Sequence, residues 1–334
     1  MSNKSEKINS LINDYNNNVR KLYLKTIHII NYIKRLRINS YRKRNIINWY
    51  VKQYYSSVNK LRTKLNADIA AIEAIVEIVQ TQEVRNKAML VGINYTGTQN
   101  QLNGCINDAE TLKKMLIQSG FNDSEINVLT DLTNIKATKS NILSNFTSLL
   151  KTAKEGDTIV FCYSGHGTYT MDKTGDETDG NDECIVPCDL NLITDDELKA
   201  IIDTTLPKGV TLVCLFDSCH SGTMLDLPYS YLADSNYETL VTNNKTANTK
   251  GNVVMISGCL DEQTSMDSNY GGKWAGAMTT AFSNAVKDKE NDMWQKLLLS
   301  MDKYLSENQY TQKPQFSMGG PTCSITDKHP FKSE

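Results

Sequence analysis

The chain has 334 residues, long enough for one large domain or for one domain with a smaller extension. Hydrophobic residues make up 40% of it, and no apolar segment approaches the length of a transmembrane helix. The net charge of −2 hides an uneven distribution, because residues 1–87 contain 17 Lys and Arg against 6 Asp and Glu, whereas the remainder contains 19 against 32.

The N-terminal part is predicted to be helical. Residues 1–86 contain neither Gly nor Pro, and apolar residues recur at intervals of three and four, as at Leu22, Ile29 and Ile33 and again between residues 69 and 79. Such intervals are typical of long amphipathic helices. We therefore expect residues 1–86 to form a basic helical extension.

Three interpretations of this extension stay open. Between Arg20 and Lys64 it has 13 basic residues and no acidic one. In the first interpretation, which we favour, the extension is a solvated helical face that packs on the acidic remainder of the chain. Otherwise it attaches to a membrane surface, an acidic partner or nucleic acid through Lys and Arg interleaved with Tyr and Trp49, or it covers an active site as a pro-segment. A nucleic-acid partner is not expected.

From residue 88 onward, apolar runs alternate with amphipathic stretches. Strands are expected at residues 88–94, 126–129, 158–163, 210–216 and 252–257, and helices at 107–120, 138–153, 195–203, 276–287 and 293–307. This alternation predicts an α/β fold with a mainly parallel sheet covered by helices on both faces. Residues 228–251 are polar without a clear period, so we expect a linker-like stretch between a large part, 87–227, and a small part, 252–334.

Two of the expected strands end in residues suited to nucleophilic catalysis. The run 210–216 leads into D-S-C-H-S-G with Cys219, and the run 158–163 leads into S-G-H-G with His166. Parallel neighbours would bring both side chains to one sheet edge, where α/β proteins bind ligands. A cysteine attacks as the thiolate and needs a base, so Cys219 is the candidate nucleophile and His166 the candidate base. The N–H groups of Gly167 and Cys219 are the expected oxyanion donors.

These motifs resemble those of the metacaspase family of caspase-like cysteine peptidases, in its type I form. The resemblance extends to G-I-N-Y-x-G-T-x-x-Q-L-x-G-C-x-N-D at residues 92–108 and to S-G-C-x-D-x-Q-T-S at 257–265, and it covers roughly residues 87–325. It implies the caspase–haemoglobinase fold, with a six-stranded sheet, and a Cys-His dyad. The helical extension is atypical, since such extensions are commonly rich in Pro or Gln.

Acidic residues near the expected nucleophile favour a basic substrate. A pair of carboxylates selects Lys or Arg by charge-assisted hydrogen bonds. The resemblance assigns Asp108 and Asp217 to the pocket for the residue before the scissile bond, with Cys105 and Ser164 beside them. Asp108 could instead cap the following helix. We expect a cysteine endopeptidase that cleaves proteins or peptides after Arg or Lys.

The resemblance also implies an activating calcium site on four aspartates, which are Asp182, Asp195, Asp196 and Asp226. Calcium prefers oxygen ligands and accepts them from distant segments. Calcium bound there would order the loop after Cys219. In the alternative, Asp195 and Asp196 are ordinary acids at a helix N-terminus, and Asp182 is one of several solvated loop acids.

An enzyme of this specificity would meet basic residues in its own exposed segments. We therefore expect a zymogen that cuts itself near Arg85 or Lys87, at the domain boundary, or near Lys245 or Lys250, in the linker-like stretch. Two alternatives remain: a catalytically silent caspase-like scaffold whose basic arm binds a partner or membrane, and a peptidase that cuts after Asn or Asp, which the pocket acids disfavour.

Location and assembly are also predicted. The eight cysteines are scattered, which indicates reduced thiols rather than a disulfide framework, and the N-terminus lacks the apolar core of a signal peptide. We therefore expect a cytoplasmic protein, and a monomer.

Overall fold

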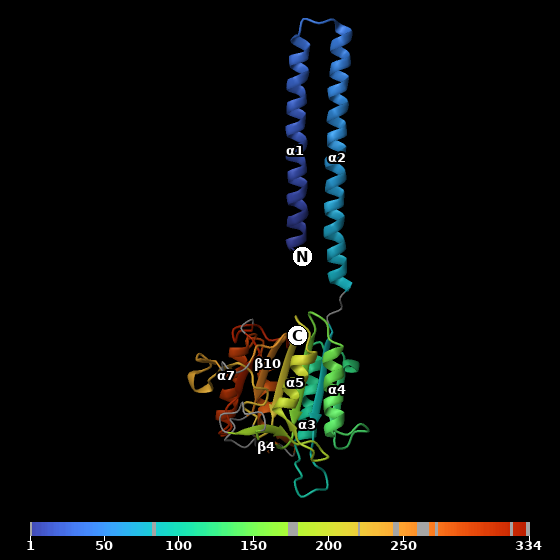
Figure 1. Ribbon diagram of the computed structural model, residues 1–334. Coiled ribbons are helices and arrows are strands. Elements are labelled where there is room, and N and C mark those ends of the chain that lie inside the picture. The colour runs from blue at the N-terminus through green and yellow to red at the C-terminus, as the bar shows by residue number, and fades with distance from the viewer. Residues whose placement is uncertain are drawn as a thin grey trace. The chain divides into compact units, whose positions relative to one another are not determined.

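The structure is a computed structural model that describes residues 2–81, 85–172, 180–219, 221–242, 247–258, 267–270, 273–320 and 323–331. It divides into two compact units, Met1–Glu83 and Val84–Glu334 (Figure 1). No helix in the described part of the chain is long and apolar enough to cross a membrane. None of the seven cysteines that the structure describes takes part in a disulfide.

The first unit is a hairpin of two long helices, α1 (Ser2–Arg35) and α2 (Ser40–Thr81), which confirms the predicted helical extension (Figure 1). The two helices meet along one seam, where the rings of Tyr23 and Tyr54 lie 6.4 Å apart between centroids. Among the hairpin side chains that the structure describes, Ile33 alone is buried. A pair of helices has only one apolar seam to share, so this unit has no enclosed core.

The second unit is built around an eight-stranded sheet with the order β2-β1-β3-β7-β10-β13-β8-β9. Five neighbouring strands are parallel, namely β2 (Ile126–Thr130), β1 (Asn86–Gly92), β3 (Thr158–Ser164), β7 (Thr211–Asp217) and β10 (Asn252–Ser257). Three antiparallel strands complete it, namely β13 (Gln315–Met318), β8 (Tyr229–Tyr231) and β9 (Leu240–Thr242). The mainly parallel sheet is confirmed.

The sheet has two more strands than the six expected. The additional strands, β8 and β9, come from the stretch 228–251, so this stretch extends the sheet edge as well as linking the two parts. Their short length and polar neighbours left no clear alternation in the sequence.

Helices cover both faces of the sheet, as predicted. One face packs against α3 (Cys105–Gln118), α6 (Ala277–Lys287) and α7 (Trp294–Glu307), and the other against α4 (Lys139–Lys151) and α5 (Asp195–Thr205). Along β3, Val160 and Cys162 join the first core, while Ile159, Phe161 and Tyr163 join the second. Because successive strand side chains point to opposite faces, a strand buried on both faces is apolar throughout.

Smaller elements lie beside this sheet. They are a three-stranded sheet of β4 (Gly167–Met171), β5 (Asn181–Ile185) and β6 (Ile193–Thr194), a hairpin of β11 (Asp267–Tyr270) and β12 (Lys273–Gly276), and the 3-10 turns η1 (Asp123–Glu125) and η2 (Ala233–Ser235). β4 begins directly after His166, and β6 leads directly into α5. These elements therefore connect the predicted catalytic edge to the predicted calcium ligands.

Candidate active site

The predicted base and nucleophile follow two neighbouring strands. β3 and β7 are paired in parallel, and their register sets Ser164 beside Asp217 at their carboxyl ends. The N–H of Gly165 donates to the carbonyl of Asp217 at 3.4 Å. His166 and Cys219 each stand two residues beyond this register pair. The structure thus brings the two predicted residues to adjacent strand ends on one edge.

The backbones of the two strand ends touch at Gly167. A side chain at this position would collide with the carbonyl oxygen of Cys219, so only glycine allows the approach. Cys219 and His166 are both half-buried, which leaves them accessible to a substrate. By contrast, complete burial raises the pKa of the thiols of Cys162 and Cys214, so these buried cysteines are poor nucleophiles.

The imidazole of His166 is held by a backbone carbonyl. Its Nε2 lies 2.8 Å from the carbonyl oxygen of Asn100. Because a carbonyl oxygen only accepts hydrogen bonds, Nε2 carries the proton in this contact. In the neutral ring, Nδ1 is then the nitrogen with a lone pair. Nothing in the sequence indicates this contact, since any residue could supply the carbonyl.

Two buried tyrosines fix the main chain around His166. The hydroxyl of Tyr163 donates to the carbonyl of His166 at 2.7 Å. The hydroxyl of Tyr95 accepts from the N–H of His166 at 2.9 Å and donates to the carbonyl of Val186 at 2.6 Å. Burial raises the pKa of both tyrosines, so both hydroxyls keep their protons. Sequence reasoning assigned no role to either.

The imidazole of His166 also contacts the ring of Tyr95. The ring of Tyr95 lies 4.7 Å from that of His166 between centroids, at an interplanar angle of 38°. The Asn100 carbonyl therefore fixes one edge of the imidazole, and the Tyr95 ring covers it.

The two predicted pocket acids converge on one glycine. Asp108 and Asp217 are buried, at 1% and 4% exposure, and a side chain at Gly276 would collide with both carboxylates. Asp108 accepts from the hydroxyl of Ser164 at 2.7 Å and from the N–H of Gly276 at 2.8 Å. Asp217 accepts from the N–H of Thr279 at 2.9 Å. Three neutral donors, one at the end of β3 and two at the start of α6, thus orient a pair of buried acids.

Asp108 does not cap α3. The N-cap residue is Gly104, which forms no side-chain cap, and Asp108 lies in the first turn with its side chain turned to the pocket.

Cys105, another predicted pocket residue, is buried at the start of α3. Burial raises the pKa of Cys162, and the negative charges of Asp108 and Asp217 raise it further. The predicted pocket residues therefore occupy one edge of the sheet.

Three of the four predicted calcium ligands form a cluster. Asp195, Asp196 and Asp226 each offer an oxygen, and these oxygens lie within 4.8 Å of one another. The carboxylate of Asp195 accepts from the N–H groups of Asp196 at 2.7 Å and Glu183 at 2.8 Å. Hard oxygen ligands from separate segments at this spacing fit calcium.

Asp182 is not a member of this cluster, although it is buried nearby. Burial raises the pKa of Asp195 to about 6, and the negative charge of Asp182 adds to the increase. Thr194 and Glu197 form the capping box of α5, so Asp195 and Asp196 occupy the first turn without being its cap. Both acids thus lie at a helix N-terminus, as the alternative interpretation expected, and also in the cluster.

The predicted cleavage positions differ in their surroundings. Arg85 and Lys250 are exposed and lie outside the strands. Lys87 lies within β1, where it is paired with Ile159 of β3. Lys245 is outside the described residues, as is His220, which follows the predicted nucleophile.

Comparison with known proteins identifies the family of this chain. A family model described as metacaspase, peptidase C14 domain, matches residues 86–228. The chain is 38% identical over 288 residues to metacaspase-1 of Debaryomyces hansenii, with 71% of this chain and 65% of that protein covered. It is 37% identical over 288 residues to metacaspase-1 of Meyerozyma guilliermondii, with 71% and 70% covered. The chain thus spans about two thirds of the length of these relatives.

A solved structure shares the fold. The crystal structure of protein GSU0716 from Geobacter sulfurreducens is 26% identical, with a TM-score of 0.56, and the match covers 74% of this chain and 98% of that one. The family model spans both strand ends that carry His166 and Cys219. The family model and the yeast relatives together show that the chain belongs to the metacaspase family of caspase-like cysteine peptidases.

Proposed function

We propose that this chain is a calcium-dependent cysteine endopeptidase that cleaves after Arg or Lys. The observation that carries the proposal is the pairing of β3 with β7, which brings the half-buried residues His166 and Cys219 to adjacent strand ends, on the edge that also holds the buried acids Asp108 and Asp217. Membership of the metacaspase family supports the peptidase class.

In this mechanism, Nδ1 of His166 takes the proton of the Cys219 thiol, and the thiolate attacks the carbonyl carbon of the scissile bond. The N–H groups of Gly167 and Cys219 donate to the oxyanion that forms. As the C–N bond breaks, the imidazolium protonates the leaving amine, and a thioester joins the substrate to Cys219. A water molecule deprotonated by His166 then hydrolyses the thioester and restores the thiol.

The contact of Nε2 with Asn100 supports the role of Nδ1 as the base. A fixed Nε2–H keeps the neutral ring in the tautomer whose lone pair is on Nδ1. The carbonyl also stabilises the imidazolium that forms after the proton transfer, because it accepts a hydrogen bond from a charged donor.

The acid pair Asp108 and Asp217 supports the choice of a basic side chain. Two carboxylates that approach the same glycine repel each other, and a guanidinium or ammonium group between them removes that repulsion. An acidic side chain would add a third negative charge to a buried pocket. The proposed site therefore accepts Arg or Lys and rejects Asp.

The cluster of Asp195, Asp196 and Asp226 would hold the calcium ion, with Asp182 close by. Bound calcium would supply positive charge that offsets the repulsion within this group of acids. Asp226 has a backbone φ of 43°, a left-handed conformation that is rare outside glycine and often marks functional sites. Because Asp226 follows Cys219 on the same segment, a ligand bond to it would fix the loop after the nucleophile.

Self-processing would use exposed sites. Arg85 and Lys250 are both exposed and outside the strands, and Arg85 lies next to the boundary between the two units. Lys87 is a poorer site because β1 would have to leave its place between β2 and β3 before a peptidase could bind it as an extended strand. Mass spectrometry of the purified chain identifies the cut, and fragments that persist in Cys219→Ala would instead implicate another protease.

The deciding experiment is a panel of fluorogenic peptides ending in Arg, Lys, Asp or Asn, assayed with calcium and with a chelator. We expect cleavage of the Arg and Lys peptides in calcium alone, and none by Cys219→Ala or His166→Ala. Asp217→Asn, which keeps the shape of the side chain, should selectively lose cleavage of the Arg peptide. Cleavage after Asp or Asn would refute the proposed specificity, and activity that survives chelation would refute calcium dependence. Inactivity toward every peptide would favour the scaffold.

A further inference from the structure

The turn between α1 and α2 carries the densest positive charge in the hairpin. We define the hairpin tip as residues 32–49, which contain six basic residues and no acidic one. The basic residues are Lys34, Arg35, Arg37, Arg42, Lys43 and Arg44. All except the half-buried Lys43 are exposed, and Lys43 donates from Nζ to the carbonyl of Lys34 at 3.0 Å. The tip is therefore a compact cationic surface.

No carboxylate of the hairpin neutralises this charge. The nearest acids along the chain are Asp14 on α1 and Asp68 on α2. At 1.5 Å per helical residue, each lies roughly 30 Å or more from the nearest basic residue of the tip on its own helix. Since charges in physiological salt are screened within about 8 Å, these acids do not offset the tip charge. The six cations repel one another, and an anionic partner would relieve that repulsion.

The tip also exposes large apolar side chains. Trp49 is 55% exposed, Tyr32 and Tyr41 are more exposed still, and Ile46 is also exposed. Leaving such surface in water costs free energy in proportion to the apolar area. Aromatic and aliphatic groups interleaved with Lys and Arg are typical of protein segments that bind at a membrane–water interface.

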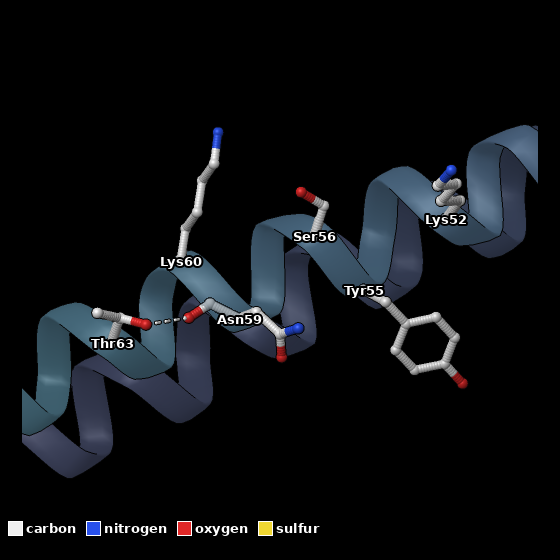
Figure 2. Close-up of a pocket in the computed structure, with 6 residues that line it drawn as sticks. All are labelled: Lys52, Tyr55, Ser56, Asn59, Lys60 and Thr63. Atoms are coloured by element: carbon white, nitrogen blue, oxygen red, sulfur yellow. Dashed lines mark hydrogen bonds between the residues drawn. The ribbon is translucent and has the colours of Figure 1, made fainter.

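The same character continues along the outer side of α2. A shallow hollow there is lined by residues of this one helix (Figure 2), namely Lys52, Tyr55, Ser56, Asn59, Lys60 and Thr63. All six are exposed, and Figure 2 shows Lys60 and Tyr55 pointing away from the helix. One helix cannot enclose a small ligand, so the hollow belongs to an extended basic and aromatic face.

Three kinds of partner can be compared on these features. A second copy of the hairpin would set like charges against each other, which opposes association. Nucleic acid would satisfy the cations and stack on the aromatic rings, but it offers nothing to Ile46 or to the exposed Leu24 and Ile27 of α1. An anionic bilayer offers phosphates to the cations, an interface to Trp49 and apolar depth to the aliphatic groups.

We propose that the hairpin tip attaches this protein to a membrane surface rich in anionic phospholipid. Lys and Arg of the tip contact the lipid headgroups, and Trp49 with its apolar neighbours enters the boundary between headgroups and acyl chains. Attachment depends on the phospholipid charge and weakens as salt rises. It does not require the peptidase reaction.

The test uses the full chain with Cys219→Ala, so that self-cleavage cannot remove the hairpin. Flotation with vesicles of phosphatidylcholine, with or without phosphatidylserine, measures binding. The tip variant combines Arg37→Gln, Arg42→Gln and Arg44→Gln, and its matched control, Arg20→Gln, Lys21→Gln and Lys25→Gln, removes the same charge from exposed positions of α1 outside the tip and the hollow. Circular dichroism checks that both variants keep their helices.

Binding is expected only with phosphatidylserine. The tip variant should bind about a hundredfold more weakly, because each cation near an anionic surface contributes about fivefold, and the control should change binding by less than about tenfold. Equal losses in the two variants would overturn the role of the tip. Binding to phosphatidylcholine alone, or to no vesicle, would overturn the proposal.

Insertion has its own readout. Vesicles should shift the tryptophan emission to the blue, and the shift should disappear in Trp49→Phe. Single-stranded RNA replaces the vesicles in a parallel assay. If RNA binds with the same dependence on the tip cations while vesicles do not bind, the surface is a nucleic-acid site and the membrane proposal is wrong.

Discussion

In the sheet unit, β3 and β7 bury apolar side chains on both faces, whereas the hairpin of α1 and α2 buries only Ile33 among its described residues. The same type of residue is buried in one unit and exposed in the other. Tyr163 is fully enclosed between the sheet and its helices, but Tyr32 is mostly exposed. A sheet covered on both faces encloses side chains, while two helices can share only one seam.

The difference extends to charge and explains what each unit can do. The sheet unit holds Asp108, Asp217 and Asp195 in buried positions, where backbone N–H groups fix their orientation. Fixed, buried charges suit a reaction that needs exact geometry. The cations of the hairpin tip, apart from the half-buried Lys43, are exposed to solvent, which suits attachment to a surface without a fixed pattern.

Hydrogen exchange on the full chain should show the largest contrast. Amides of β3 and β7 should exchange with the global unfolding of the sheet unit, at least about a thousandfold more slowly than those of α1 and α2, which open locally. Mass spectrometry after pepsin digestion measures both units in one sample. Protection in the hairpin equal to that of β3 would contradict the comparison and show that the hairpin is stabilised as strongly as the core.

The sequence predicted the parts of the fold that burial makes distinctive. β3 and β7 were found because strands buried on both faces are continuously apolar. β9 and β13 were missed, since β9 is exposed at the sheet edge and β13 is a four-residue strand after Pro314. β5 was missed because it begins with polar residues in an Asp-rich segment that looked like a loop.

The site was predicted where side-chain identity carries the signal. His166 and Cys219 stand in sequence motifs whose residue types are specific to the family, and the structure brings both residues to neighbouring strand ends. The carbonyl of Asn100 and the N–H of Gly276 could not be predicted, because every backbone offers such groups. Tyr163 was hidden for another reason: within β3 it looks like any apolar core residue.

Matched isoleucine substitutions sharpen the contrast in stability. Ile256 of β10 and Ile33 of α1 are both buried. Ile256→Ala should destabilise the sheet unit by about 2–5 kcal/mol, because the tightly packed core cannot close the cavity. Ile33→Ala should leave the melting transition of that unit unchanged. Differential scanning calorimetry measures both, and a sheet transition lowered equally by Ile33→Ala would mean that the units unfold together.

Substitutions of two buried tyrosines distinguish a role in positioning His166 from a role in stability. Tyr163→Phe removes the hydroxyl that bonds to the carbonyl of His166, and it should lower kcat by about tenfold to a hundredfold through misplacement of the imidazole. Tyr237→Phe is the control, since its buried hydroxyl donates to the carbonyl of Pro314 at 2.9 Å, away from the site. Each variant should lose roughly 1–2 kcal/mol of stability.

Of these two variants, Tyr163→Phe alone should also change the pH profile of kcat/KM, because the Tyr163 hydroxyl contacts His166, the residue that carries the proton, and the Tyr237 hydroxyl does not. Steady-state kinetics across pH, with thermal melts on the same samples, measures both effects. A proportional loss of activity and stability in the two variants would show that Tyr163 only supports the core.

The smallest expected effect concerns pH and two histidines, one in each unit. His329 is buried beside Trp294 with its Nε2 bonded to the carbonyl of Asn291, and His28 is exposed on α1. Burial lowers the pKa of His329, although the hydrogen bond to Asn291 and the charge of Asp292 oppose the decrease. The folded unit therefore binds this proton less readily than the unfolded chain.

Stability from a neutral His329 is complete above the unfolded pKa of about 6.5 and is lost as pH falls toward the lower pKa of the folded state. The melting temperature of the sheet unit should thus fall between neutral and mildly acidic pH, and it should fall less in His329→Gln. His28→Gln should leave the pH dependence unchanged, because this exposed side chain lies in the hairpin and not in the sheet unit whose melting is measured. Equal slopes in the wild-type protein and His329→Gln would mean that other groups, such as the buried acids, set the pH dependence of the core.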